Sequence, residues 1–147
     1  MVAVTSVRRA GEADFDALTD VWQRAVTTTH TFLTTDDVAV MRPHVRDGLL
    51  PSMDVWAVVD DDGAPVAFVG AHDDHVRLLY VDPAWHGQGL GTRLLDVAQG
   101  DRPSLRVTVY ARNTAGLAFY RSRGFAETGR GSDDLGAGPL ETVDLQR

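Results

Sequence analysis

The chain contains no cysteine and no lysine, and these two absences exclude several kinds of protein. Without cysteine it can form no disulfide, bind no metal through thiolates and carry no covalent intermediate on sulfur. Without lysine it cannot contain a phosphate-binding P-loop, because that motif requires Gly-Lys followed by Ser or Thr. All 14 basic residues are arginine. Any group transfer by this protein must therefore be direct, without an acyl group resting on a cysteine.

Long apolar runs are also missing from the sequence. No stretch is long enough to span a bilayer, and Arg8 and Arg9 follow the first apolar residues instead of preceding them, unlike a signal peptide. We therefore expect a cytoplasmic protein with no membrane partner.

The formal net charge of -7 at pH 7 argues against a nucleic-acid partner, whose phosphates the surface would repel. An acidic surface favours cationic substrates, although it also serves solubility alone.

The composition is that of a compact globular protein. The chain has 147 residues, of which 44% are apolar, and shows no linker or internal repeat. We expect one domain over residues 1–147, present as a monomer or a homodimer, with no metal site.

A glycine-rich segment is the most informative feature that is present. A strand-like run at 76–81 leads through Asp82-Pro83 into His-Gly-Gln-Gly-Leu-Gly at 86–91, and leucines then recur at helical spacing up to Gly100. Glycines at the start of a helix let backbone N–H groups approach an anion at the positive end of the helix dipole. The spacing differs from the Gly-x-Gly-x-x-Gly of dinucleotide-binding folds. The pattern indicates a pyrophosphate site, with a simple helix-starting turn as the alternative.

A second motif lies downstream, at 113–125, after another strand-like run at 105–110. Asn113 can cap a helix there and Gly124 can end it. In order and separation, the two motifs resemble those of the GNAT superfamily of N-acetyltransferases: Arg/Gln-x-x-Gly-x-Gly/Ala after the fourth strand, and Asn-x-x-Ala-x-x-Phe/Leu-Tyr-x-x-x-Gly-Phe after the fifth. The segments 29–33 (Thr-His-Thr-Phe-Leu) and 133–136 (Asp-Asp-Leu-Gly) resemble the small bacterial YjaB-like subgroup of that family.

The remaining pattern agrees with an α+β fold. We expect a strand near 2–9, a helix with Phe15, Leu18, Trp22 and Ala25 on one face, and a second helix that starts at Thr34.

A capping box of Thr34 with Asp37 should start that second helix, and Pro43 should kink or split it. A hairpin over 55–60 and 66–71 and final strands at 125–128 and 140–145 complete the layout. The sum is a mixed, mainly antiparallel sheet with about four helices, which fits the GNAT fold, in which the fourth and fifth strands splay apart around the cofactor.

The resemblance implies that an amine attacks acetyl-CoA directly within a ternary complex. It assigns Tyr120 as the acid that protonates the coenzyme A sulfur, and we nominate the Leu79 N–H as donor to the thioester oxygen. The cofactor-binding residues expected from the motifs are Leu79, Tyr80, Val81, His86, Gly87, Gln88, Gly89, Leu90, Gly91, Thr92, Arg93, Asn113, Phe119 and Tyr120.

Two positions depart from the family pattern. Arg77 stands on the fourth strand where many relatives have an acidic residue, so the usual carboxylate base is missing. His86 stands where arginine or glutamine is usual, and an imidazole donates to phosphate more weakly. His30 is the first candidate for the base because histidine titrates near neutral pH; His75 and a water-relayed path are the alternatives.

The acceptor site is expected to involve His30, Phe32, Trp56, Arg77, Asp133 and Asp134. Asp133 or Asp134, in an expected loop over 132–136, could hold a cationic amine. This loop and the bulk of Trp56 favour a small-molecule amine acceptor. Two alternatives remain: a protein lysine or N-terminal acetyltransferase, and a non-catalytic acyl-CoA-binding sensor module.

Overall fold

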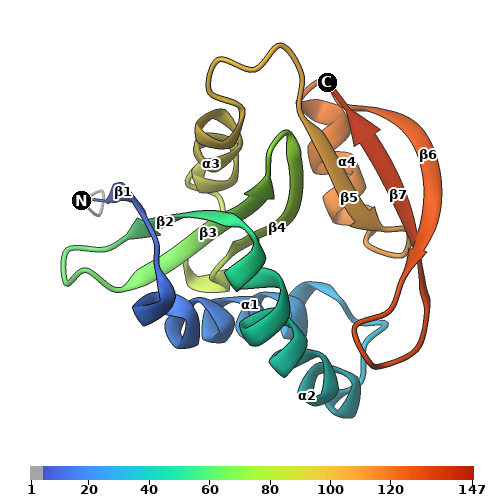
Figure 1. The fold of residues 1–147 in the computed structure, drawn as a ribbon, viewed down its shortest axis with the longest axis horizontal. Coiled ribbons are helices and arrows are strands. Elements are labelled where there is room, and N and C mark those ends of the chain that lie inside the picture. The colour runs from blue at the N-terminus through green and yellow to red at the C-terminus, as the bar shows by residue number, and fades with distance from the viewer. Residues whose placement is uncertain (1–4) are drawn as a thin grey trace.

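The computed structural model describes residues 5–147, and its architecture is a central sheet with helices on both faces (Figure 1). The strands are β1 (Ser6–Arg9), β2 (Asp54–Val59), β3 (Pro65–His72), β4 (His75–Val81), β5 (Arg106–Tyr110), β6 (Ala126–Asp133) and β7 (Leu140–Gln146), and the α-helices are α1 (Phe15–Thr29), α2 (Thr35–His44), α3 (Leu90–Gln99) and α4 (Thr114–Ser122).

The seven strands are ordered β1-β2-β3-β4-β5-β7-β6. All neighbours pair antiparallel except β4 and β5, which are parallel. This confirms the predicted fold class, a mixed, mainly antiparallel sheet with four α-helices in the described residues. Of the strand expected near 2–9, residues 6–9 form β1, and residues 1–4 lie outside the described residues.

Helices α1 and α2 cover one face of the sheet. Phe15, Leu18, Trp22 and Ala25 of α1 are all buried, as the helical spacing predicted. The capping box of α2 is also present: the Asp37 N–H donates to Thr34 Oγ1 at 3.0 Å, and the Thr34 N–H donates to the Asp37 carboxylate at 2.9 Å.

Pro43 lies near the end of α2 and ends the regular helix, as predicted. Proline offers no N–H for the helical ladder, and after His44 the chain continues as a π-helical turn, Val45–Leu49, and a 3-10 turn, Leu50–Ser52. Val45 and Leu50 are nevertheless fully buried, so packing against the sheet holds this irregular segment in place. Within residues 5–147, no helix is both long enough and apolar enough to cross a membrane.

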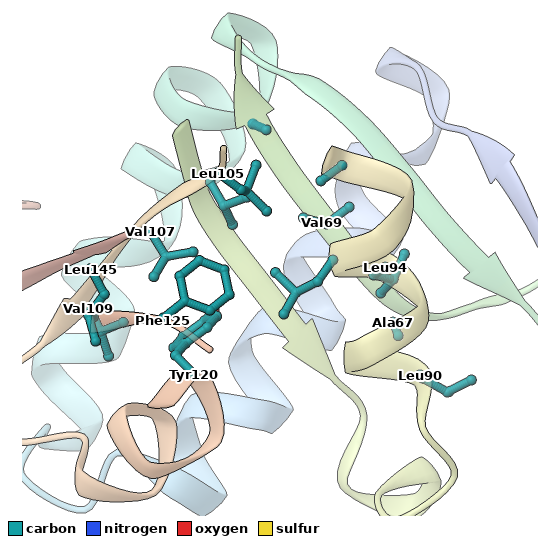
Figure 2. Close-up of a cluster of buried hydrophobic side chains, with 14 of the residues drawn as sticks. Ala67, Val69, Leu90, Leu94, Leu105, Val107, Val109, Tyr120, Phe125 and Leu145 are labelled. Carbon is teal, nitrogen blue, oxygen red and sulfur yellow. The ribbon is translucent and has the colours of Figure 1, made fainter. Parts of the chain in front are cut away.

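Helices α3 and α4 cover the opposite face, over a second buried cluster. Leu94 and Leu95 of α3 and Val107 of β5 are at most 1% exposed. Figure 2 shows the rings of Tyr120 and Phe125 beside the side chains of β5. The Gly124 φ of 88° lets the chain turn between α4 and the next strand, where the motif placed this glycine.

The last two strands are longer than the sequence predicted. The sixth was expected to end at residue 128, but β6 runs to Asp133 and pairs with the whole of β7. Gly129 and Gly131 lower the local strand preference, whereas pairing with β7 supplies the hydrogen bonds that hold the segment extended. Ser132 and Asp133, expected in a loop, therefore end a strand.

Candidate active site

The site is built where β4 and β5 part. These parallel strands pair only at His75 with Arg106 and at Val76 with Val107, and then diverge. Figure 1 shows the two ribbons spreading apart toward the C-terminal end of β4. A cavity of about 450 Å³ is lined by residues of both strands, of α1, α3 and α4, and of the glycine segment. One cavity therefore connects the two faces of the sheet through the splay.

An irregularity in β4 determines which groups face this cavity. The register of β4 against β3 shifts at Arg77, so that Val76 and Leu79 pack on the α3/α4 face while Leu78 packs on the α1/α2 face. One extra residue inverts the alternation of side chains along a strand. The bulge thus lets Leu79 lie on the same face as α3 and α4.

The backbone of Leu79 and Val81 points into the splay. The Asp82 N–H donates to Val66 O of β3 at 2.8 Å, and from Leu78 to Val81 the register is regular. Alternate residues of a strand direct their N–H and C=O groups to opposite sides, so Leu79 and Val81 direct theirs away from β3. His86 Nε2 lies 3.0 Å from the Val81 carbonyl and donates to it.

The glycine segment forms an open backbone cradle in front of α3. Gly87 and Gly89 both have φ of 76°, a conformation that side chains disfavour, and no heavy atom lies within 4 Å of where a Cβ would stand on either. Gly89 is the N-cap of α3, so the first N–H groups of that helix face the cradle. This donor set fits an anion such as a pyrophosphate.

Tyr120 and Asn113 border the cavity from the second motif. Tyr120 is 8% exposed, and burial raises the pKa of its hydroxyl above the ordinary value. Asn113 caps α4, because its Oδ1 accepts from the Gly116 N–H at 3.0 Å. Phe119 packs on Tyr120 with ring centroids 5.2 Å apart, and Arg123 stacks on Phe119 at 4.3 Å.

The arginine at the cavity differs from the one nominated from the sequence. Arg93 does not line the cavity and donates to Thr5 Oγ1 at 2.9 Å. Arg123 does line it, and its Nε donates to Thr92 Oγ1 at 2.8 Å, which ties α4 to the start of α3. Gln88, also nominated, is absent from the lining, while its neighbours Gly87 and Gly89 are present.

Aromatic rings surround His30 on the α1/α2 side of the cavity. Its ring centroid lies 6.2 Å from that of Tyr80, 6.0 Å from that of Tyr110 and 5.4 Å from that of Phe32. His30 Nδ1 is 2.7 Å from Thr29 Oγ1. Burial lowers the pKa of His30 to about 4. The expectation that His30 titrates near neutral pH is therefore wrong, and its ring is neutral at physiological pH.

Charged groups meet the cavity at the end of β6. Arg77 of β4 donates to the Asp133 carboxylate at 2.9 Å, and both side chains are about one-third exposed. Both residues also line the cavity. Arg77 is thus paired with a carboxylate from β6, and this ion pair stands at the position on β4 where many relatives have an acidic residue.

Three nominated acceptor residues do not line the cavity. Trp56 lies on β2, two strands from β4, under Arg9 on the α3/α4 face. Asp134 accepts from the N–H groups of Gly136 and Gly138 and shapes the turn before β7. Phe32 stands behind the ring of His30.

Several cavity residues were missed by the sequence analysis. Tyr110 is one of them: its ring lies on the α1/α2 side with that of Tyr80, which was nominated and whose hydroxyl pKa is raised by burial to about 12. The alternation of 107–110 was a usable signal, because valines on one face leave Thr108 and Tyr110 on the other. The missed lining residues include Trp22, Ala25, Leu49, Thr108, Tyr110 and Thr142.

Comparisons with known proteins identify the family. A family model described as an acetyltransferase (GNAT) domain matches residues 52–127. Peptidyl-lysine N-acetyltransferase YjaB of Salmonella typhimurium is 36% identical over 132 residues, covering 89% of this chain and 90% of that protein. The solution structure of apo-form YjaB from Escherichia coli matches with a TM-score of 0.86 at 33% identity over 97% of each chain.

A more distant structure shares the fold alone. The crystal structure of PaiA N-acetyltransferase from Thermoplasma acidophilum, in complex with coenzyme A, matches with a TM-score of 0.77 at 14% identity over 98% of each chain. The chain therefore belongs to the GNAT acetyltransferase family and is YjaB-like within it. It is an N-acetyltransferase with acetyl-CoA as its cofactor, which confirms the enzyme class and the cofactor predicted from the two motifs.

Proposed function

We propose that the protein transfers an acetyl group from acetyl-CoA directly to the side-chain amine of a lysine in a protein or peptide. The observation that carries the proposal is the cavity that joins the glycine cradle on one face of the sheet to an aromatic and acidic wall on the other. The lysine acceptor is supported by two relatives named peptidyl-lysine N-acetyltransferase, which are 36% and 34% identical to this chain.

A small-molecule acceptor, the main expectation from the sequence, has less support. That expectation depended on Trp56 in the acceptor pocket and on the loop after β6, and Trp56 lies away from the cavity. We place the enzyme in the cytoplasm and treat the whole chain as one catalytic domain.

The backbone of the splay and the glycine cradle would hold acetyl-CoA. The N–H groups of Gly87, Gly89 and the first turn of α3 suit its pyrophosphate, while the N–H and C=O groups of Val81 suit an extended pantetheine arm that lies against β4 like an added strand. His86 donates to the same Val81 carbonyl, so its ring would have to yield that acceptor. Bound acetyl-CoA supplies the activated thioester.

Two groups of the chain would assist the transfer itself. The Leu79 N–H points into the splay and would donate to the thioester oxygen as negative charge develops there. Tyr120 keeps its proton at physiological pH because burial raises its pKa, so it would serve as the hydrogen-bond donor and acid for the departing sulfur.

The opposite side of the cavity suits a lysine side chain. Aromatic faces attract a cation and also contact its apolar stem, and Tyr80 and Tyr110 supply such faces. Asp133 would attract the ammonium group, and Arg77 would hold that carboxylate in place. His30 would wall the pocket as a neutral ring.

Acetylation of a defined peptide tests the proposal. The substrate is a peptide with a blocked N-terminus and one central lysine, compared with the doubly blocked lysine residue alone; the same peptide with arginine in place of lysine is the control. Released thiol gives the rate, and mass spectrometry locates the acetyl group. We expect kcat/KM to be at least about tenfold higher for the peptide than for the single residue. Acetylation of small amines without acetylation of the peptide would overturn the lysine assignment, and acetyl-CoA binding without any transfer would favour the sensor alternative.

A further inference from the structure

Three polar side chains form a hydrogen-bonded chain across β4, β5 and β7 beside the splay. His75 Nε2 lies 2.6 Å from Thr108 Oγ1, and Thr108 Oγ1 donates to Asp144 Oδ1 at 2.8 Å. Thr108 and Asp144 are direct cross-strand partners, and His75 stands where β4 still pairs with β5. Of the three, only Thr108 lines the cavity. The cavity is therefore linked through one hydroxyl to a carboxylate outside it.

The direction of the hydrogen bonds follows from the groups involved. Thr108 has a single hydroxyl hydrogen, which it gives to the carboxylate of Asp144, so its oxygen accepts from His75 Nε2–H. His75 thereby orients the hydroxyl toward Asp144. One lone pair of the Thr108 oxygen remains for a further donor from the cavity.

Burial and the neighbouring positive charges favour the neutral form of His75. Its pKa is lowered, first by burial and then by the positive charges of Arg106 and Arg77, against the opposing effects of Asp144 and Asp74. The hydrogen bond to Thr108 requires a proton on Nε2, which the neutral Nε2–H tautomer carries. Arg106 is paired with Asp74 at 3.0 Å, and Arg77 with Asp133, so neither arginine occupies the Asp144 carboxylate.

The proposed reaction needs a base that the other candidates do not provide. A lysine amine is protonated at neutral pH and must lose a proton before it can attack. His30 is only 4% exposed, so its ring has no direct route for passing a proton on to solvent. Arg77 stands where a carboxylate would otherwise project from β4, and Asp133 is already engaged in an ion pair with that arginine.

We propose, on the basis of the lysine acetyltransferase function above, that Thr108 and Asp144 form the proton relay that deprotonates the acceptor amine, with His75 as the positioning residue. The amine N–H bond breaks as its proton moves to Thr108 Oγ1, directly or through one water molecule. The Thr108 O–H bond breaks at the same time as its own proton moves to the Asp144 carboxylate. Asp144, partly exposed, then returns that proton to solvent.

The test compares pH profiles of Thr108→Val and Asp144→Asn with that of the wild type, using the single-lysine peptide at saturating acetyl-CoA. Valine keeps the shape of threonine without its hydroxyl, and asparagine still accepts the Thr108 hydrogen bond but takes up no proton. We expect each variant to lower kcat at pH 7 by about 10- to 100-fold, with KM for acetyl-CoA unchanged. The loss should shrink as the pH approaches the pKa of free lysine, about 10.4, because the amine then arrives deprotonated.

Two further variants separate the relay from a structural effect. Thr128→Val is the matched control, because the Thr128 hydroxyl donates to the backbone carbonyl of Asp144 at 3.3 Å and not to its carboxylate; we expect wild-type kinetics. The double variant of Thr108→Val with Asp144→Asn should lose no more than either single variant, since both interrupt one path.

The outcomes distinguish the relay from the lysine assignment. Wild-type turnover in Thr108→Val and Asp144→Asn, or an equal loss at every pH, would overturn the relay. If the wild type acetylates only small amines, the lysine assignment fails, and the same pH comparison with such an amine decides the relay. Absence of transfer to any amine would overturn both.

Discussion

Tyr120 is packed in the core and borders the cavity at the same time. Its ring contacts Phe119 and Phe125 at centroid distances of 5.2 and 5.4 Å, and it is 8% exposed. Burial raises the pKa of the hydroxyl, because the phenolate is less well solvated there than in water. The hydroxyl therefore keeps its proton at physiological pH.

Changing Tyr120→Phe should lower kcat by about 100-fold at saturating acetyl-CoA and peptide, since phenylalanine keeps the packing but offers no proton to the sulfur. The measurement is thiol release under both saturating conditions, with thermal unfolding of the variant as the check on its fold. Unchanged turnover in a folded Tyr120→Phe protein would contradict the acid assignment.

His30 provides a second prediction at the residue scale, about stability. Its pKa falls from the ordinary value of 6.5 to about 4 on folding because of burial. Between these pH values the unfolded chain binds the additional proton, so the free energy of unfolding should fall as the pH drops from 6.5 to 4, by about 3 kcal/mol in total. Urea denaturation across this range measures the slope.

The variant His30→Gln should remove most of that slope, and His72→Gln, at an exposed histidine, should leave it in place. His75 contributes with the same sign because its pKa is also lowered, so a residual slope is expected. An identical slope in wild type and His30→Gln would show that His30 is not the buried neutral ring described above.

At the scale of elements, the bulge in β4 and the short β4–β5 pairing together produce the splay. Helix α3 then starts at Leu90, immediately after the two left-handed glycines, so its positive end faces the cradle. The geometry of the cradle depends on backbone conformation more than on any side chain. Two glycine substitutions can distinguish the effect of backbone strain from the effect of steric crowding by the new side chain.

Gly89→Ala should lower the free energy of unfolding by about 1 to 2 kcal/mol, because alanine is strained at positive φ. Gly48→Ala is the matched control: it too has no atom within 4 Å of the new Cβ, but its φ is not positive. We expect it to be neutral or stabilising by up to about 1 kcal/mol. Urea denaturation of both variants measures the difference, and equal stability changes would contradict the importance of the backbone conformation.

For the molecule as a whole, the parts of the candidate site that are built from one short segment of the chain could be predicted from the sequence. The glycine cradle, Asn113 at the start of α4 and Tyr120 within it all depend on residues close together in the chain, so short-range patterns identified them. The acceptor wall depends on contacts between distant segments. Asp133 reaches Arg77 only because β6 extends beyond its glycines, a result of pairing that no local preference indicates.

The position of Trp56 was unpredictable for a related reason. The side chains of β2 point alternately to the two faces of the sheet. Whether one of them reaches the cavity depends on the strand order, in which β3 lies between β2 and β4. Likewise, Thr108 joins His75 and Asp144 only through the register of three strands. Contacts between side chains of different strands depend on strand order and register. These are determined by the whole chain and cannot be predicted from one local segment.

The central claim, that acetyl-CoA binds at the glycine cradle in front of α3, is tested most directly by calorimetry. Acetyl-CoA is titrated into the wild type, into Gly89→Trp, which fills the cradle, and into Gly63→Trp in the β2–β3 turn. Gly63 has a similar φ, 82°, and equally open surroundings, so it controls for strain. We predict binding by the wild type and Gly63→Trp and at least about a hundredfold weaker binding by Gly89→Trp. Equal binding by all three proteins, or none by the wild type, would contradict the account.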